Sequence, residues 1–346
     1  MRVAMYYNNK DIRIEEMPKP KIGPNELLVK TMACGICGSD VMEWYRIKKA
    51  PRVLGHEMTG EIGEIGDNVK DFKVGDRVFV SHHVPCNKCL YCLDGQHTVC
   101  EILHNTNLDP GGFSEFVRVP KINVECGTFS LPNEISFEDG TFIEPLGCVV
   151  RGQRRANIKS NHTVLVIGSG ISGLLHIKLA CAKGVERVIA TDINEYRMNA
   201  AKKSGADVVI NARHDVSARV KEANEGRLAD RIIVCTGAVS AIKQALKSID
   251  AGGTILFFAP TEPGVDIFLP FNEFWSSQTT LTTTYAAAPN DLERAIELIR
   301  SRKVNVHDMI THRLSLAEIS KGFQLVADAN ESIKVIIKPR KEIEFD

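Results

Sequence analysis

The segment TVLVIGSGISGLLHIKLACAKGVERVIATD, residues 163–192, decides the fold of this 346-residue chain. It begins with the apolar run 163–167, which leads into a G-x-G-x-x-G pattern over residues 168–173 and a helix-like stretch over 172–184. A second apolar run then ends at Asp192, nineteen residues after Gly173. This succession of strand, glycine turn, helix, strand and acid is the fingerprint of a dinucleotide-binding βαβ unit. The segment therefore predicts a doubly wound parallel sheet.

Each position of the fingerprint has a physical role. Gly168 permits a tight turn, Gly170 lets the backbone approach a pyrophosphate, and Gly173 allows close packing of helix on strand. An acid at Asp192 accepts hydrogen bonds from the adenosine ribose and repels a 2′-phosphate, which favours NAD over NADP. The expected cofactor-binding residues are Gly168, Gly170, Ile171, Gly173, Asp192 and Arg197. The alternative is a glycine-rich turn without a ligand, in which Asp192 only caps the helix of residues 195–205.

The chain around this segment divides into two kinds of pattern. From residue 163 onward, short apolar runs alternate with amphipathic stretches, as expected of a parallel sheet covered on both faces. Residues 1 to about 150 are instead rich in short strand-like runs broken by glycine and polar residues. The expected strands are 27–33, 59–66, 76–83, 187–192, 231–237, 254–260 and 332–339, and the expected helices 172–184, 195–205 and 291–304. The length suits two domains, and the fold class expected for the whole chain is α/β.

Composition excludes several classes of protein. The 43 Lys and Arg residues balance 43 Asp and Glu residues, so a strongly basic nucleic-acid surface is not expected. With 44% hydrophobic and 25% charged residues, the chain has the composition of a globular protein. No apolar run approaches the roughly 18 residues needed to span a bilayer, and the first residues lack a signal-peptide pattern. We therefore expect a cytoplasmic protein that binds neither nucleic acid nor a membrane.

Four of the ten cysteines lie together in the sequence. Cys86, Cys89, Cys92 and Cys100 fall within fifteen residues, whereas Cys126, Cys181 and Cys235 stand alone. Four thiolates this close can surround Zn²⁺ as a tetrahedral structural site with no open position. The alternatives are four unrelated cysteines or a zinc ribbon that touches nucleic acid, and the neutral charge disfavours the second.

A more dispersed group of residues suggests a second zinc site. Cys37 lies in CGICGSD (34–40), His56 and Glu57 in GHE (55–57), and Glu144 in IEPLG (143–147). Zinc accepts thiolate, imidazole and carboxylate together.

The residues around these positions carry a family resemblance. The pattern G55-H56-E57-x2-G60-x5-G66-x2-V69, GDRV (75–78), the four-cysteine loop, GGFSEFVRVP (111–120) and the glycine fingerprint follow one another along the whole chain.

In this order the chain resembles the zinc-dependent medium-chain alcohol dehydrogenases, and the EPL tripeptide resembles their polyol branch, which includes sorbitol and L-iditol dehydrogenases. The resemblance implies a GroES-like β-barrel catalytic domain over 1–151 and 286–346 and a Rossmann NAD-binding domain over 152–285. It implies a catalytic zinc held by Cys37, His56 and Glu57, with Glu144 as fourth ligand or as partner of a zinc-bound water. Cys148 is the competing candidate for the fourth position.

The resemblance also implies an activity. Zinc acts as a Lewis acid on a secondary alcohol, Ser39 takes the hydroxyl proton, and a hydride is transferred to NAD. The expected substrate is a polyol of the sorbitol or L-iditol type. L-threonine, another secondary alcohol, or a catalytically silent NAD- and zinc-binding relative remain alternatives. Met42 stands where the family commonly has a relay histidine, and Thr284-Tyr285 where polyol dehydrogenases often have Arg-Tyr. The resemblance also implies two zinc ions per chain and a homotetramer or homodimer.

Overall fold

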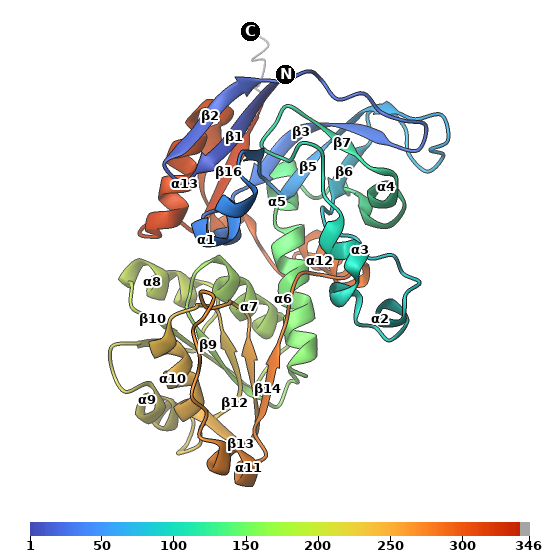
Figure 1. Cartoon of the computed structure of the whole chain (residues 1–346). Coiled ribbons are helices and arrows are strands. Elements are labelled where there is room, and N and C mark those ends of the chain that lie inside the picture. Colours follow the sequence, from blue (N-terminus) through green and yellow to red (C-terminus); the bar gives the residue numbers. More distant parts are fainter. Residues whose placement is uncertain (340–346) are drawn as a thin grey trace. The chain divides into compact units, whose positions relative to one another are not determined.

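The computed structural model describes residues 1–339, and these residues separate into two units (Figure 1). One unit comprises Met1–Gly147 and the chain from Ala286 onward, and the other comprises Cys148–Tyr285. The division falls within helix α6 (Ile143–Arg155), a few residues before the boundary expected at 151/152. No helix in the described part of the chain is both long and apolar enough to cross a membrane.

The unit Cys148–Tyr285 is built on a six-stranded sheet whose strands are all parallel. Its strand order is β11-β10-β9-β12-β13-β14, so the first strand of the unit lies near the centre and the chain winds outward in both directions. This is the doubly wound arrangement of dinucleotide-binding folds. The strands are β9 (Thr163–Ile167), β10 (Arg187–Asp192), β11 (Val208–Asn211), β12 (Ala229–Val234), β13 (Ile249–Phe257) and β14 (Thr280–Thr283). The fold class predicted from residues 163–192 is confirmed.

Helices connect these strands and cover the sheet, as Figure 1 shows. They are α7 (Ile171–Ala182), α8 (Glu195–Lys203), α9 (Val216–Ala223), α10 (Val239–Ser248) and α11 (Phe271–Ser277). Every residue of β9 is buried, because helices pack on both faces of a central parallel strand. Helices α7 and α8 begin and end within about two residues of the predicted positions.

The other unit contains two sheets around one apolar core. Strands β1 (Arg2–Asn8), β2 (Asp11–Glu16) and β4 (Arg52–Val53) form the smaller sheet. The larger sheet has the order β15-β16-β3-β5-β6-β8, and β7 also pairs with β3. Its strands are β3 (Leu27–Gly35), β5 (Glu57–Ile65), β6 (Arg77–Val80), β7 (Phe116–Val119), β8 (Thr128–Ser130), β15 (Ile310–Ser315) and β16 (Lys334–Lys338). An antiparallel bridge between Val3 and Ser114 links the smaller sheet to the chain that enters β7.

Short helices close this unit around the core. They are α1 (Glu43–Arg46), α2 (Leu90–Leu93), α3 (Glu101–Asn105), α4 (Lys121–Gly127), α5 (Phe137–Gly140), α12 (Pro289–Arg300) and α13 (Ile319–Asp328). The 3₁₀ helices are Gly38–Asp40, Ile47–Lys49, His97–Val99, His307–Met309 and Leu316–Glu318. The core includes Phe323, whose ring contacts the rings of Tyr6 and Phe113. Cys37 follows the last residue of β3, and His56 precedes the first residue of β5. This sheet therefore positions the second candidate zinc site.

Candidate active site and metal centres

The four clustered cysteines come together in the segment between β6 and β7. Their ligand atoms all lie within 4.8 Å of one another. The Sγ atoms of Cys86 and Cys92 are 3.9 Å apart, those of Cys89 and Cys92 3.5 Å, and those of Cys100 and Cys86 3.6 Å. Sulfurs around a tetrahedral zinc with bonds of about 2.3 Å lie about 3.8 Å apart. The four thiols are free of disulfides and have the spacing that a zinc ion requires.

The protonation of these thiols also points to a cation. Backbone amides of Lys88 and Cys89 donate toward the Cys86 sulfur and lower the pKa of Cys86 to about 6. Burial and the neighbouring thiols raise the pKa of Cys92 to about 12. A bound cation would be needed for all four to be thiolates together, because adjacent negative charges repel one another. Besides the cysteines themselves, the small apolar cluster of this segment contains only Leu103 among the described residues.

Three of the residues predicted for the second zinc site lie close together in the structure. Cys37, His56 and Glu57 offer ligand atoms that lie within 4.8 Å of one another, although Cys37 follows β3 and the other two residues lie at the start of β5. His56 and Glu57 are buried and Cys37 is partly buried. Thiolate, imidazole and carboxylate on a partly buried site suit a zinc ion that keeps one position open.

Asp40 contacts two of the three candidate ligands, Cys37 and His56. It is fully buried, it accepts a hydrogen bond from the Cys37 amide at 3.1 Å, and its Oδ1 lies 3.4 Å from His56 Nδ1. A carboxylate on Nδ1 leaves Nε2 as the metal-binding nitrogen, as at many histidine–metal sites. Burial alone would raise the pKa of Asp40, but the His56 ring and Arg46 beside the carboxylate lower it on balance. Asp40 therefore acts as a fixed negative charge.

Ser39 lies directly beside Cys37. Its hydroxyl is 3.4 Å from Cys37 Sγ, and it accepts a hydrogen bond from Arg46 Nη2 at 2.8 Å. Arg46 also donates to the Ser39 carbonyl and to Asp40, so it holds the short helix Gly38–Asp40 in place. Met42, which stands at the expected relay position, has no atom that accepts and passes on a proton.

Glu57 has a partner that the sequence did not reveal. Its Oε2 is paired with the ammonium of Lys334 on β16, and both side chains are at most 1% exposed. Gly35 makes room for the pair, because a Cβ at that position would collide with both side chains. Lys334 therefore holds the Glu57 carboxylate in the interior.

Glu144 and Cys148 stand one turn apart on α6. Glu144 is buried, with 8% of its surface exposed. Within residues 1–339, the ligand-atom cluster that contains Cys37 does not include Glu144. The geometry therefore brings three of the four expected ligands together.

The glycine fingerprint forms the expected strand-to-helix turn between β9 and α7. Gly168 has a positive φ of 91°, and a Cβ at Gly173 would collide with the Gly168 carbonyl. At Gly170 an added Cβ would meet only the guanidinium of Arg197, about 3.9 Å away. Gly170 is also the N-cap of α7, and Ile171 is its first residue. The helix therefore presents free N–H groups beside a position where backbone can approach a phosphate.

Asp192 ends β10 and is 7% exposed. Its Oδ2 accepts from the Ser169 amide at 2.8 Å, and its Oδ1 accepts from the amides of Ile193 and Asn194. The N-cap of α8 is Asn194, whose side chain accepts from the Arg197 amide. Asp192 therefore ties the glycine turn to the end of β10, and the capping role considered for it belongs to Asn194.

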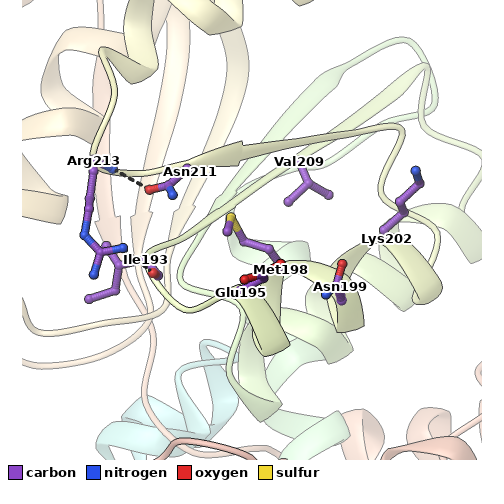
Figure 2. A pocket seen from close by; sticks show the side chains of 8 residues that line it. All are labelled: Ile193, Glu195, Met198, Asn199, Lys202, Val209, Asn211 and Arg213. Carbon is purple, nitrogen blue, oxygen red and sulfur yellow. Dashed lines mark hydrogen bonds between the residues drawn. The ribbon is translucent and has the colours of Figure 1, made fainter.

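A groove of about 420 Å³ opens between α8 and β11, just beyond Asp192 (Figure 2). Arg213 at its edge donates from Nη1 to the Ile193 carbonyl at 2.6 Å, and from its amide to the Asn211 side chain. The lining residues are Ile193, Glu195, Met198, Asn199, Lys202, Val209, Asn211 and Arg213. None of them is a candidate metal ligand, so the groove is separate from both cysteine-containing clusters.

Sequence reasoning missed the polar residues that support the candidate ligands. Asp40 ends the motif CGICGSD but was given no role there, Arg46 and Lys334 lie outside every quoted motif, and Lys334 is 277 positions from Glu57. The one available signal was Lys334 itself, a lysine directly before the apolar run Val335–Ile337. A charged residue at such a position is normally buried only with a partner.

Two family models match the chain. The alcohol dehydrogenase GroES-like domain matches residues 23–126, and the zinc-binding dehydrogenase model matches residues 172–301. The chain is 30% identical to sorbitol dehydrogenase of Bacillus subtilis (strain 168), across 99% of this chain and 98% of that protein. It is 32% identical to L-threonine 3-dehydrogenase of Bacillus licheniformis, across 94% of each chain.

A solved structure has the same fold. It is a zinc-binding dehydrogenase from Sinorhizobium meliloti 1021 bound to NADP, with a TM-score of 0.88 and 26% identity over 98% of this chain and 99% of that one. Sequence and fold agree over nearly the full length of both proteins. The chain therefore belongs to the zinc-dependent medium-chain alcohol dehydrogenase family, on its polyol branch, and is an oxidoreductase that works with zinc and a nicotinamide dinucleotide.

Proposed function

We propose that this protein oxidises a secondary alcohol, a polyol of the sorbitol or L-iditol type, with NAD, and that it reduces the corresponding ketone in reverse. The observation that carries the proposal is the placement of Ser39 Oγ, 3.4 Å from the Sγ atom of Cys37, which clusters with His56 and Glu57. A substrate hydroxyl at this cluster would lie beside a side chain that can accept its proton.

The candidate catalytic zinc is held by Cys37, His56 and Glu57, with Glu144 or a water that it binds in the fourth position. Zinc at this site supplies Lewis acidity, which lowers the pKa of an alcohol. Cys86, Cys89, Cys92 and Cys100 hold the structural zinc, which gives two ions per chain. The donor sets fit both assignments, since the first mixes ligand types and the second is four sulfurs.

The protein's own groups arrange the proton transfer. Arg46 donates to Ser39 Oγ, so one lone pair of that oxygen remains for a substrate hydroxyl. Arg46 cannot accept a proton, and Met42 offers no acceptor. The proton therefore does not leave Ser39 through a relay histidine at position 42. Asp40 keeps the imidazole of His56 oriented while this happens.

NAD is the proposed cofactor. Bound NAD would supply the hydride acceptor, and the N-terminus of α7 would hold its pyrophosphate. Gly168, Gly170, Ile171 and Gly173 form that turn, and the Arg197 guanidinium lies next to Gly170. Asp192 places a carboxylate where a 2′-phosphate of NADP would be repelled. Relatives of this chain include an NADP-bound one, so the preference for NAD rests on Asp192.

Self-association is supported by one surface of the nucleotide-binding unit. Phe268, Phe271 and Trp275, just before and within α11, are 92%, 75% and 73% exposed. They precede β14, the strand at one edge of the parallel sheet. An apolar patch beside a free strand edge is typical of a protein interface. We propose a homodimer or homotetramer. The free state of all ten cysteines supports a cytoplasmic location.

The test is a panel of polyols, simple secondary alcohols and L-threonine, assayed with NAD and NADP on protein of known zinc content. The proposal predicts two zinc ions per chain and the highest kcat/KM with a polyol and NAD. A preference for L-threonine would support the alternative of an L-threonine 3-dehydrogenase. Full binding of zinc and NAD without turnover of any alcohol would identify a catalytically silent relative.

A further inference from the structure

Basic side chains lie near the candidate zinc site, and the charges of Arg46 and Asp40 act on Arg52. Arg46 binds Ser39, and Arg52 lies on β4, four residues before His56 and opposite Tyr6 of β1. The ring of His82, which follows β6, has its centre 4.6 Å from that of His56, and the His83 ring lies 3.9 Å from His82. The side chains come from three separate segments of the same unit. They form what we call the basic wall: Arg46, Arg52, His82 and His83.

The positive charge of this wall is not fully compensated. Asp40 is the carboxylate that contacts it, and its two oxygens already accept from Arg46 and from the Cys37 amide. Among the residues that the structure describes, no side chain forms an ion pair or a hydrogen bond with the Arg52 guanidinium. One permanent positive charge is therefore left over.

Arg52 is also withdrawn from solvent. Its side chain is partly buried, and burial together with the positive charge of Arg46 lowers the pKa of Arg52. A partly buried cation without a partner destabilises a folded protein, because its hydration is lost and nothing replaces it. The Nδ1 atom of His82 is a second polar atom of the wall that is buried without a hydrogen-bond partner in residues 1–339. Two incomplete groups on one wall indicate that a ligand completes them.

We infer that the alcohol substrate carries an anionic group, a carboxylate or a phosphate monoester, and that Arg52 binds this group while the carbinol lies at Cys37 and Ser39. The guanidinium of Arg46 already donates to Ser39 and Asp40. The guanidinium of Arg52 is therefore the one whose donors remain for a ligand. A guanidinium fork matches both carboxylate and phosphate through two parallel hydrogen bonds. The inference rests on the proposed oxidation of a polyol and narrows its substrate to a sugar acid or a polyol phosphate.

The first experiment compares substrates that differ only in charge. Hexitols, hexonates and hexitol monophosphates of matched configuration are assayed with NAD at low ionic strength. We expect kcat/KM for one anionic series to exceed that for the neutral hexitols by about tenfold or more, since hydrogen bonds to charged groups contribute about 1.5–3 kcal/mol. The hexonate arm reports a carboxylate site, and the monophosphate arm reports a phosphate site.

The second experiment uses Arg52→Met, which keeps most of the unbranched stem of the side chain and removes its charge. The variant should raise KM for the preferred anion about tenfold or more and leave kcat within about twofold, because Arg52 does not touch the reacting carbon. Its activity on neutral hexitols should change less than about twofold. Lys49→Met is the matched control: Lys49 is an exposed lysine in the same connection, and its loss should change neither constant by more than about twofold.

A binding measurement makes the test independent of turnover. Titration calorimetry of the zinc-loaded protein, saturated with NADH, is carried out with D-gluconate and with inorganic phosphate. Wild type and the Lys49→Met variant should bind one of them, and Arg52→Met should bind it at least about tenfold more weakly. The comparison between variants cancels anion binding elsewhere on the chain.

The outcomes separate this inference from the proposed function. Efficient oxidation of neutral hexitols, with equal kinetics and equal anion binding in wild type and Arg52→Met, would overturn the inference and leave the proposed function standing. Anion binding that depends on Arg52, with no oxidation of any alcohol, would overturn the proposed function and retain Arg52 as an anion site. Equal anion binding by the two proteins and no turnover would contradict both.

Discussion

Glu57 and Lys334 form an ion pair in the interior of the catalytic unit, between the first residue of β5 and the first residue of β16. Both side chains are at most 1% exposed, and the ammonium also lies 5.2 Å from the centre of the Phe142 ring. The pair ties a candidate zinc ligand to the last strand of the unit.

Breaking this pair should cost more than losing a surface ion pair. Replacing Lys334 by Met leaves the Glu57 carboxylate buried without a partner, and we expect a loss of about 3–5 kcal/mol in the free energy of unfolding. The double variant Glu57→Gln, Lys334→Met removes both charges and should lose less than the sum of the single changes. Denaturant unfolding of the four proteins measures this coupling. Additive losses would show that the two charges do not depend on each other.

The two zinc sites should fail in different ways. Cys92→Ala removes a ligand from a segment whose apolar cluster is little more than its cysteines. Metal binding there is part of the folding free energy, so the melting temperature should fall and about one zinc per chain should be lost. Cys37→Ala should also lose about one zinc, but it should stay folded on the core around Phe113 and lose nearly all turnover.

Zinc content, melting temperature and turnover of the two variants check this assignment. Cys181→Ala is the control, because Cys181 is exposed and belongs to neither cluster. A Cys37 variant that unfolds beside a stable Cys92 variant would mean that the structural and catalytic assignments are reversed.

Asp192 should affect both cofactor preference and the glycine turn. Its carboxylate accepts three backbone N–H groups, so Asp192→Gly should weaken the turn as well as the binding of NAD. We expect NAD affinity to fall about tenfold or more and the preference for NAD over NADP to narrow, because charge-assisted hydrogen bonds contribute about 1.5–3 kcal/mol. Asp192→Asn removes the charge and keeps an acceptor oxygen, so it separates repulsion of the 2′-phosphate from loss of structure. Fluorescence titration with NADH and NADPH measures the affinities of both variants. An unchanged ratio of NADH affinity to NADPH affinity would assign Asp192 a structural role alone.

The exposed apolar patch of α11 should support self-association. A glutamate in place of Trp275 adds a charge to a side chain that is 73% exposed, so folding should be unaffected while an apolar interface would be disrupted. Light scattering coupled to gel filtration should show a dimer or tetramer for the wild type and a smaller species for Trp275→Glu. Val74→Glu, at an exposed position of the other unit, is the control. A monomeric wild type would refute the proposed oligomer.

The sequence predicted the parts of this protein whose signal is local. The strand, glycine turn and helix of residues 163–182 lie in consecutive positions, and the parallel pairing of β9 with β10 follows from their apolar composition. The four cysteines were likewise visible as one short cluster.

The remaining site residues depend on contacts between distant segments. The pairing of β16 with β3 sets the position of Lys334, and nothing near Lys334 in the sequence indicates Glu57 as its partner. Arg46 and Arg52 appear in sequence as two cations in a loop rich in lysine. Only the structure shows that Arg46 binds Ser39 and Asp40, whereas Arg52 forms no ion pair with an acid in residues 1–339.

Proton uptake by Ser39 can be tested without knowing the natural substrate. Ser39→Ala removes the hydroxyl beside Cys37 Sγ and should lower kcat by about 10²–10⁴-fold, while zinc content and NAD affinity stay unchanged. Ser39→Thr keeps a hydroxyl and should retain a larger share of activity. A Ser39→Ala variant with wild-type kcat would remove Ser39 from the proton path.

Isotope transfer to the cofactor tests the central claim most directly. The best alcohol of the panel is prepared with deuterium on its carbinol carbon and incubated with NAD and the zinc-loaded protein, and the reduced cofactor is analysed by mass spectrometry. We predict that the wild type yields NADH carrying one deuterium and that Cys37→Ala yields none. Unlabelled NADH, or the absence of NADH from protein shown to hold both zinc ions and NAD, would contradict the proposed function.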